Sequence, residues 1–143
     1  MGKRIKANPT PSETRRIEAA KSLGGLVRFS FKYFQDNHAT YDPTDCKPGY
    51  FLSLLDRLRE LSRLEMRSLQ NRKADSTIRF HRIDFTDKRV SSNGFGIPKC
   101  ELFDEEAWQF SLTANEYGRV HGFVIEDTFF VVWFDPDHQL YHS

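Results

Sequence analysis

The feature that most constrains the fold is a pair of adjacent β-forming runs within Glu116–Tyr141. Both runs are rich in β-branched and aromatic side chains, and only the polar pair Glu126–Asp127 separates them. Two such runs joined by two polar residues predict a β-hairpin in which Ile125 faces Thr128. The rest of the chain must therefore supply neighbours for a hairpin that is too apolar to stand alone.

Alternation of side chains gives the predicted hairpin two faces. Counting back from the turn, Arg119 falls opposite Phe134 and His121 opposite Val132. One face is expected to carry Arg119, His121, Phe123, Ile125, Phe130 and Phe134, and the other Val120, Val124, Phe129, Val131 and Trp133. Both faces are mostly apolar, so we expect the hairpin inside a sheet with helices against one side. Arg119 and His121 are then polar side chains on an apolar face, which marks them as candidate site residues.

Shorter elements are predicted before the hairpin. Ser12 is a suitable cap for a short helix that runs to Lys21 and ends at Gly24–Gly25. Alternating patterns predict strands over residues 26–34, 77–85 and 108–114.

A long amphipathic helix is predicted from Pro48 to about Asn71, with Asp45 as its cap. Its apolar stripe comprises Phe51, Leu54, Leu55, Leu58, Leu61, Leu64 and Leu69. The opposite side carries Arg59, Arg63 and Arg67 at four-residue spacing. This basic stripe is either a solvated helix face or a surface that contacts phosphates.

The order helix, strand, long helix and then four strands indicates an α+β fold. We expect a mainly antiparallel sheet of four to five strands packed against the long helix. The chain of 143 residues suits one such domain over residues 26–143, preceded by a basic arm and short helix in residues 1–25.

Charge is divided unevenly along the chain. Residues 1–100 hold 20 Lys and Arg against 11 Asp and Glu, whereas residues 101–143 hold one Arg against nine acids. This split indicates either a basic face for a polyanion and an acidic face for another partner, or two halves that neutralise each other.

Several classes of protein are not indicated. Cys46 and Cys100 are far apart and outside any CxxC pattern, so neither a disulfide scaffold nor a zinc site is predicted. No signal peptide or membrane span is recognisable, and we expect a cytoplasmic protein. The sequence Asp135-Pro136-Asp137-His138 predicts a turn rather than a metal site. Neither a Walker loop nor a glycine-rich dinucleotide turn occurs, and no cofactor is predicted.

From Gly96 to His138 the sequence resembles the RelE/YoeB-type toxins, the small mRNA interferases of bacterial toxin–antitoxin modules. The resemblance lies in Gly96-Ile97-Pro98, an acidic stretch to Glu106, Trp108, Arg119 at the start of a strand, and His138 followed by Tyr141. It implies a RelE-like fold, cleavage of mRNA at the ribosome with inhibition of translation, and a cognate antitoxin as partner.

The resemblance also implies roles for individual residues. Attack of a ribose 2′-OH on the adjacent phosphate needs a base, an acid for the leaving 5′-oxygen and a cation for the extra negative charge. Arg119 would stabilise the phosphate and His138 would act as the general acid, since an imidazole titrates near neutral pH. Glu101 would be the base, and Tyr141 would stack on or orient the substrate.

Further residues are candidates for binding nucleic acid because they are basic or lie beside basic residues on predicted strands and helices. They are Arg59, Arg63, Arg67, Arg79, His81, Arg82 and His121. Two alternatives stay open: a non-catalytic module of the same fold that binds nucleic acid or protein, and a gyrase-poisoning toxin of the same superfamily.

Overall fold

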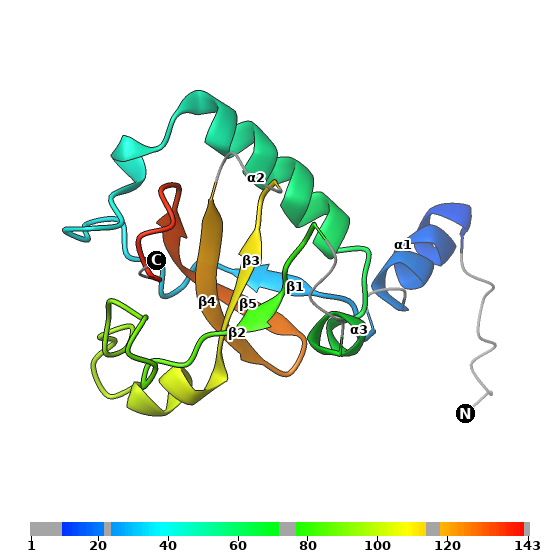
Figure 1. Ribbon diagram of the computed structural model, residues 1–143. Helices are drawn as coiled ribbons and strands as arrows, with labels where there is room; N and C mark the ends of the chain where they lie inside the picture. The colour runs from blue at the N-terminus through cyan, green and yellow to red at the C-terminus, as the bar shows by residue number, and fades with distance from the viewer. Residues whose placement is uncertain (1–9, 22–23, 72–76, 114–117, 142–143) are drawn as a thin grey trace.

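The computed structural model describes residues 10–21, 24–71, 77–113 and 118–141. Its elements are α1 (Pro11–Lys21), β1 (Arg28–Ser30), the 3₁₀ helix η1 (Pro43–Asp45), α2 (Pro48–Leu61), α3 (Met66–Gln70), β2 (His81–Arg82), the 3₁₀ helix η2 (Glu101–Glu106), β3 (Ala107–Ser111), β4 (Arg119–Ile125) and β5 (Thr128–Asp135). The predicted α+β class is confirmed (Figure 1). No helix in the described part of the chain is long and apolar enough to cross a membrane.

The described strands form one open mixed sheet in the order β1-β5-β4-β3-β2. Strands β2 to β5 pair antiparallel with their neighbours, but β1 lies parallel to β5. Parallel neighbours need a long crossover, and here α2, α3 and the other three strands lie between β1 and β5 in the chain. The parallel edge is where the sheet differs from the mainly antiparallel arrangement expected.

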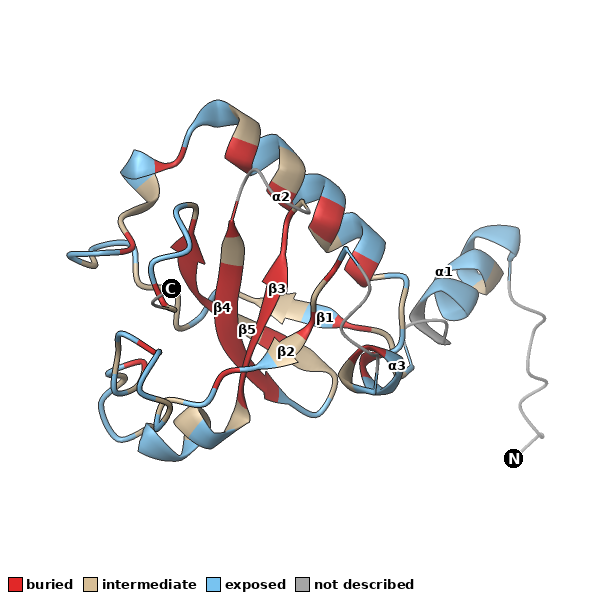
Figure 2. Cartoon of the chain, in the orientation of Figure 1, coloured by how far each residue is buried: buried red, intermediate tan, exposed pale blue. Residues whose placement is uncertain are grey.

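Two layers cover the sheet differently (Figures 1 and 2). Helix α2 packs Tyr50, Leu54 and Leu61 onto one face, which we call the helix face. The opposite face, the loop face, is covered by irregular segments that bury side chains such as Tyr41 and Leu140. Buried residues concentrate in β3, β4 and β5, as the red ribbon in Figure 2 shows.

The predicted hairpin exists, and Ile125 pairs with Thr128 as expected. Further from the turn the predicted register is wrong, because Arg119 pairs with Asp135 and His121 with Trp133.

The cause is a β-bulge in the middle of the hairpin. His121 pairs with Trp133 but its neighbour Gly122 pairs with Val131, so Val132 is one residue too many. An extra residue reverses the side-chain alternation beyond it. Trp133 therefore joins the core of the loop face and Phe134 that of the helix face, the reverse of the predicted assignment.

The predicted long helix is broken after Leu61. The backbone that follows pairs with the start of the first strand region: Val27 N donates to Leu64 O at 2.9 Å, and Met66 N donates to Gly25 O at 3.0 Å. In a continuous helix these backbone N–H and C=O groups would bond to residues four positions away in the same helix. Because they bond to Gly25 and Val27 instead, α2 ends and a new helix begins as α3.

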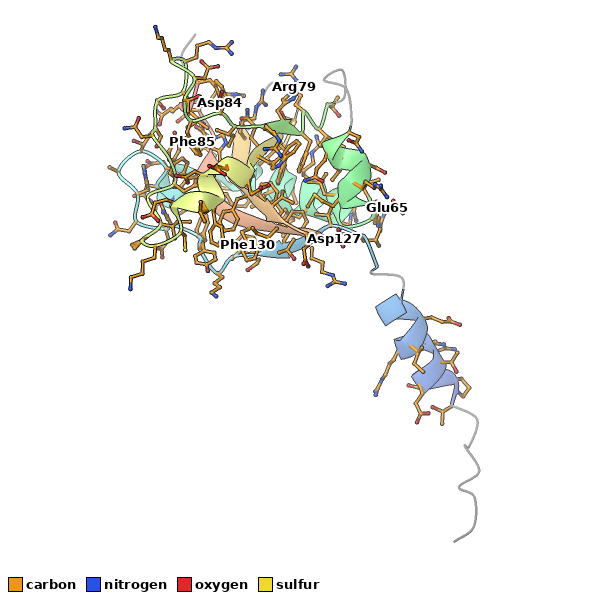
Figure 3. The ribbon with its side chains drawn as sticks, turned by 90° about the horizontal axis from the view of Figure 1, so that it is seen from below. Glu65, Arg79, Asp84, Phe85, Asp127 and Phe130 are labelled. Atoms are coloured by element: carbon orange, nitrogen blue, oxygen red, sulfur yellow. The ribbon has the colours of Figure 1, made fainter. Side chains whose placement is uncertain are left out.

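Other predicted boundaries also change. Asp45 lies in η1 instead of capping α2, whose N-cap is Lys47. Thr10 and Glu13, not Ser12, make the reciprocal hydrogen bonds of a capping box at α1, at 3.1 and 3.2 Å. Helix α1 stands apart from both layers (Figures 1 and 3).

The predicted helix stripe is only partly buried. Leu55 is 65% exposed, whereas Arg57, which was not assigned to the stripe, is 7% exposed. Arg57 donates to Leu112 O at 3.0 Å and to Glu60 at 2.8 Å, which satisfies part of its buried guanidinium.

Candidate active site

A pocket of about 240 Å³ opens on the loop face of the sheet. It is lined by His81, Gln109, Arg119, His121, Asp135, His138 and Tyr141. These side chains come from β2, β3, β4, β5 and the segment after β5, so residues far apart in sequence meet only in the folded sheet.

The strand register explains why the pocket is polar. His81 pairs with Gln109, and Gln109 pairs with His121, which forms a row across β2, β3 and β4. Residues directly opposite each other on neighbouring strands point to the same face. In a second row Arg119 lies between Ser111 on β3 and Asp135 on β5.

His121 and Asp135 form a buried pair at the base of the pocket. His121 Nε2 and Asp135 Oδ2 are 2.8 Å apart, and both side chains are 1% exposed. The backbone N–H groups of Gln139 and Leu140 also donate to this carboxylate, at 2.8 and 3.1 Å. Burial alone would raise the pKa of Asp135, but these hydrogen bonds and the imidazole outweigh it and hold that pKa below 3.8. The other imidazole nitrogen, His121 Nδ1, has no hydrogen-bond partner among the described residues.

Arg119 is half-buried beside this pair. Its Nη1 donates to Ser111 Oγ, and its backbone carbonyl accepts a 3.0 Å hydrogen bond from the Tyr50 hydroxyl on α2. Burial and the nearby Arg79 lower the pKa of Arg119, against the opposing effect of Asp135. Within the described ranges, Ser111 is the one hydrogen-bond partner seen for this guanidinium, which leaves its remaining N–H groups for a ligand.

Two further histidines face the same positive charges. Burial, Arg119 and Arg79 all lower the pKa of His81. Partial desolvation and Arg119 likewise lower the pKa of His138, whose backbone has a left-handed φ of 55°. Positive groups this close together repel one another and so lower one another's pKa. A bound anion would relieve that repulsion, which favours anion binding at this site.

Arg79 is the second fixed cation near the pocket. It precedes β2, is partly buried and has a φ of 48° (Figure 3). Its charge lowers the pKa values of His81, Arg119 and His138.

Tyr141 forms part of the pocket wall. Its backbone forms an isolated antiparallel bridge with Val90. Burial, the largest effect, raises its pKa. The partly buried ring therefore lies in the wall of the pocket, next to a backbone held by Val90.

Other sequence-predicted residues lie elsewhere. Glu101 is exposed on η2 and lines a different hollow, with Ser92 and Asp104, so it is not brought to Arg119. Arg82 lies over the Trp108 ring, 5.2 Å from its centroid, and donates to Glu105 O.

The basic stripe is on the other side of the sheet. Arg59, Arg63 and Arg67 are exposed on α2, the link that follows it and α3, all outside the pocket. His121 does line the pocket but is fully buried, so its imidazole does not form an exposed binding surface.

Sequence reasoning missed Gln109, Ser111 and Asp135 as site residues. Gln109 and Ser111 are the polar side of a strand whose other side is Trp108 and Phe110, and this alternation was the available signal. The sequence placed Asp135 only in a turn. The face of the sheet on which its side chain lies depends on the β-bulge, which was not predicted.

No cluster of three or more His, Cys, Asp or Glu side chains in the described ranges is arranged to hold a metal ion. Comparison of the chain with known protein families finds no matching family model. Comparisons with curated proteins and with solved structures likewise give no match.

Proposed function

We propose that this chain is an endoribonuclease that cleaves RNA in the pocket around Arg119. The observation that carries the proposal is the meeting of two histidines, His81 and His138, with Arg119 in one small pocket. Two imidazoles can serve as the base and the acid, and an arginine as the cation, that phosphodiester cleavage by an internal 2′-OH needs.

In the proposed reaction Arg119 binds a non-bridging oxygen of the scissile phosphate, and Arg79 adds positive charge. Neutral His81 removes the proton from the 2′-OH as the O2′–P bond forms. Protonated His138 gives a proton to the 5′-oxygen as the P–O5′ bond breaks. The products are a 2′,3′-cyclic phosphate and a 5′-hydroxyl. His81 here takes the part that the resemblance had given to Glu101, because Glu101 lines another hollow.

Tyr141 and Gln109 complete the proposed site. The half-buried ring of Tyr141 offers a flat wall to the substrate, and the Gln109 amide lies in the row between His81 and His121. Together with the resemblance, this favours a RelE-like toxin that inhibits translation by cutting mRNA at the ribosome. A cognate antitoxin would be its partner, and it would act in the cytoplasm.

A cleavage assay tests the reaction. The purified chain is incubated with a short labelled single-stranded RNA, with the same sequence as DNA, and with mRNA on ribosomes. We expect RNA products ending in 2′,3′-cyclic phosphate and no cleavage of DNA. Arg119→Ala, His81→Ala and His138→Ala should each lower the rate about 10²- to 10⁴-fold. Arg28→Ala, exposed on β1 and outside the pocket lining, is the matched control and should leave the rate unchanged.

Growth provides a second test. Expression of the chain without an antitoxin should arrest bacterial growth, and Arg119→Ala or His138→Ala should relieve the arrest. Normal growth, together with intact RNA both free and on ribosomes, would refute the proposal. Salt-sensitive RNA binding without cleavage would point instead to the non-catalytic module.

A further inference from the structure

The segment after β5 is attached to the domain at few points. Ser91 N donates to Leu140 O at 2.6 Å, and Ser91 Oγ donates to Gln139 O at 2.8 Å. On the other side, Asp135 accepts the backbone N–H groups of Gln139 and Leu140. His138 therefore lies in a short loop that the Asp135 carboxylate closes.

The conformation of His138 needs such support. A φ of 55° is in the left-handed region, which is strained for a residue with a Cβ. Residues in this region keep the conformation only when the surrounding structure holds them. The hydrogen bonds to Asp135 begin at the next residue, Gln139.

Asp135 in turn is held by His121. A buried carboxylate must be paired or hydrogen-bonded, and the 2.8 Å contact to His121 Nε2 supplies the side-chain partner. His121 is fully buried, so we assign it no direct contact with the substrate. Its hydrogen bond to Asp135 links the imidazole to the loop that carries His138.

We propose that His121 and Asp135 are positioning residues that hold His138 and Tyr141 in the pocket. This inference rests on the proposed function, since it assigns the pair a part in the same reaction. The His121 imidazole holds the Asp135 carboxylate, and this carboxylate holds the backbone N–H groups of Gln139 and Leu140. That backbone in turn holds His138. The titratable side chains whose charges act on the pKa of His138 are Arg119, Asp135, His121 and Arg79.

A matched pair of acid-to-amide variants tests the role of Asp135. Asp135→Asn and Asp137→Asn remove the same charge on either side of Pro136, but Asp137 is exposed and only Asp135 closes the loop. Because a misplacement of about 1 Å costs about 10²-fold in rate, Asp135→Asn should lower kcat about 100-fold with little change in KM. Asp137→Asn should change kcat less than about threefold.

A second pair tests His121 in case Asp135→Asn does not fold. Glutamine places an amide N–H near the position of Nε2, whereas asparagine is too short to reach the carboxylate. His121→Gln should keep most of kcat, and His121→Asn should lose about as much as Asp135→Asn. Circular dichroism and thermal unfolding identify the variants that fold.

The His138 ring signals in NMR provide a readout that does not depend on cleavage. They should move in Asp135→Asn and His121→Asn, and stay close to wild type in Asp137→Asn and His121→Gln. Equal kcat and equal His138 signals in folded Asp135→Asn and Asp137→Asn would overturn the inference, as would equal losses in His121→Gln and His121→Asn. If wild type cleaves no RNA but the His138 signals move as expected, the proposed function fails and the positioning role stands.

Discussion

Replacing Gly122 with alanine tests whether the β-bulge is fixed by a close backbone approach. A Cβ at this position would lie 2.0 Å from the carbonyl oxygen of Phe130 and 2.6 Å from Cε1 of Phe129. Side-chain carbons essentially never lie within 3.0 Å of such atoms, so β5 must move by about an ångström. Overpacking costs about 1–3 kcal/mol, and a backbone obstacle inside the sheet favours the upper end, about 3 kcal/mol. At about 3 °C per kcal/mol, Tm should fall by about 9 °C.

Urea unfolding followed by tryptophan fluorescence measures this loss. Gly96→Ala is the matched control, because a Cβ there meets nothing within 4 Å and only its φ of +67° adds strain, about 1 kcal/mol. In the folded fraction of Gly122→Ala, displaced β5 should also move Asp135 from His121 and lower RNA cleavage. A free energy of unfolding reduced no more than that of Gly96→Ala would show that the bulge is not fixed by this contact.

Three further predictions follow from the charges. The pKa values of His81 and His138 are both lowered from 6.5, so kcat/KM for RNA should follow a bell-shaped pH profile with its maximum below pH 6.5. Arg57→Ala should lower the free energy of unfolding by about 3 kcal/mol because it leaves buried acceptors unpaired, whereas Arg59→Ala, in an exposed 3.9 Å ion pair, should change it by less than about 0.5 kcal/mol, as urea titration can measure. The folded pKa of Asp135 lies below 3.8, so its contribution to stability is present above pH 3.8 and is lost as pH falls through the folded pKa; Asp135→Asn should flatten the acid limb of a stability–pH curve.

The parts of the fold that sequence predicted well are those set by neighbouring residues. The hairpin turn depends on a two-residue loop between β-forming runs, and the pairing of Ile125 with Thr128 follows from it. The opposite faces of β3 also follow from alternation, since Trp108 and Phe110 join the helix-face core while Gln109 lines the pocket.

Predictions failed where distant segments compete for the same backbone. The helix pattern continues past Leu61, but the carbonyl of Leu64 and the N–H of Met66 pair with the chain near Val27. Helical periodicity carries no information about such a partner. Strands β1 and β2 are shorter than their patterns predicted. Each is an edge strand with one neighbour, so only a few residues of each alternating pattern pair with another strand.

The site illustrates the same limit. Arg119 and His121 stood out because they are polar on an apolar strand, and both line the pocket. Glu101 was chosen for its nearness in sequence to a motif, and the fold puts it beside a separate hollow. Asp135 could not be assigned to the face of His121 without knowing that Val132 is an extra residue.

Segment charge also fails to predict the field inside the pocket. Residues 101–143 contain nine acids and only one basic residue that is not histidine, Arg119, which makes this part of the chain look unsuited to a polyanion. The sheet order changes that balance, because β2 lies beside β3 and brings His81 and the adjacent Arg79 from the basic part of the chain. Asp135, the one acid among the described residues that line the pocket, accepts hydrogen bonds from two backbone N–H groups and is paired with an imidazole. A pocket built from both halves can therefore attract a phosphate even though the strand that supplies its arginine belongs to the acidic half.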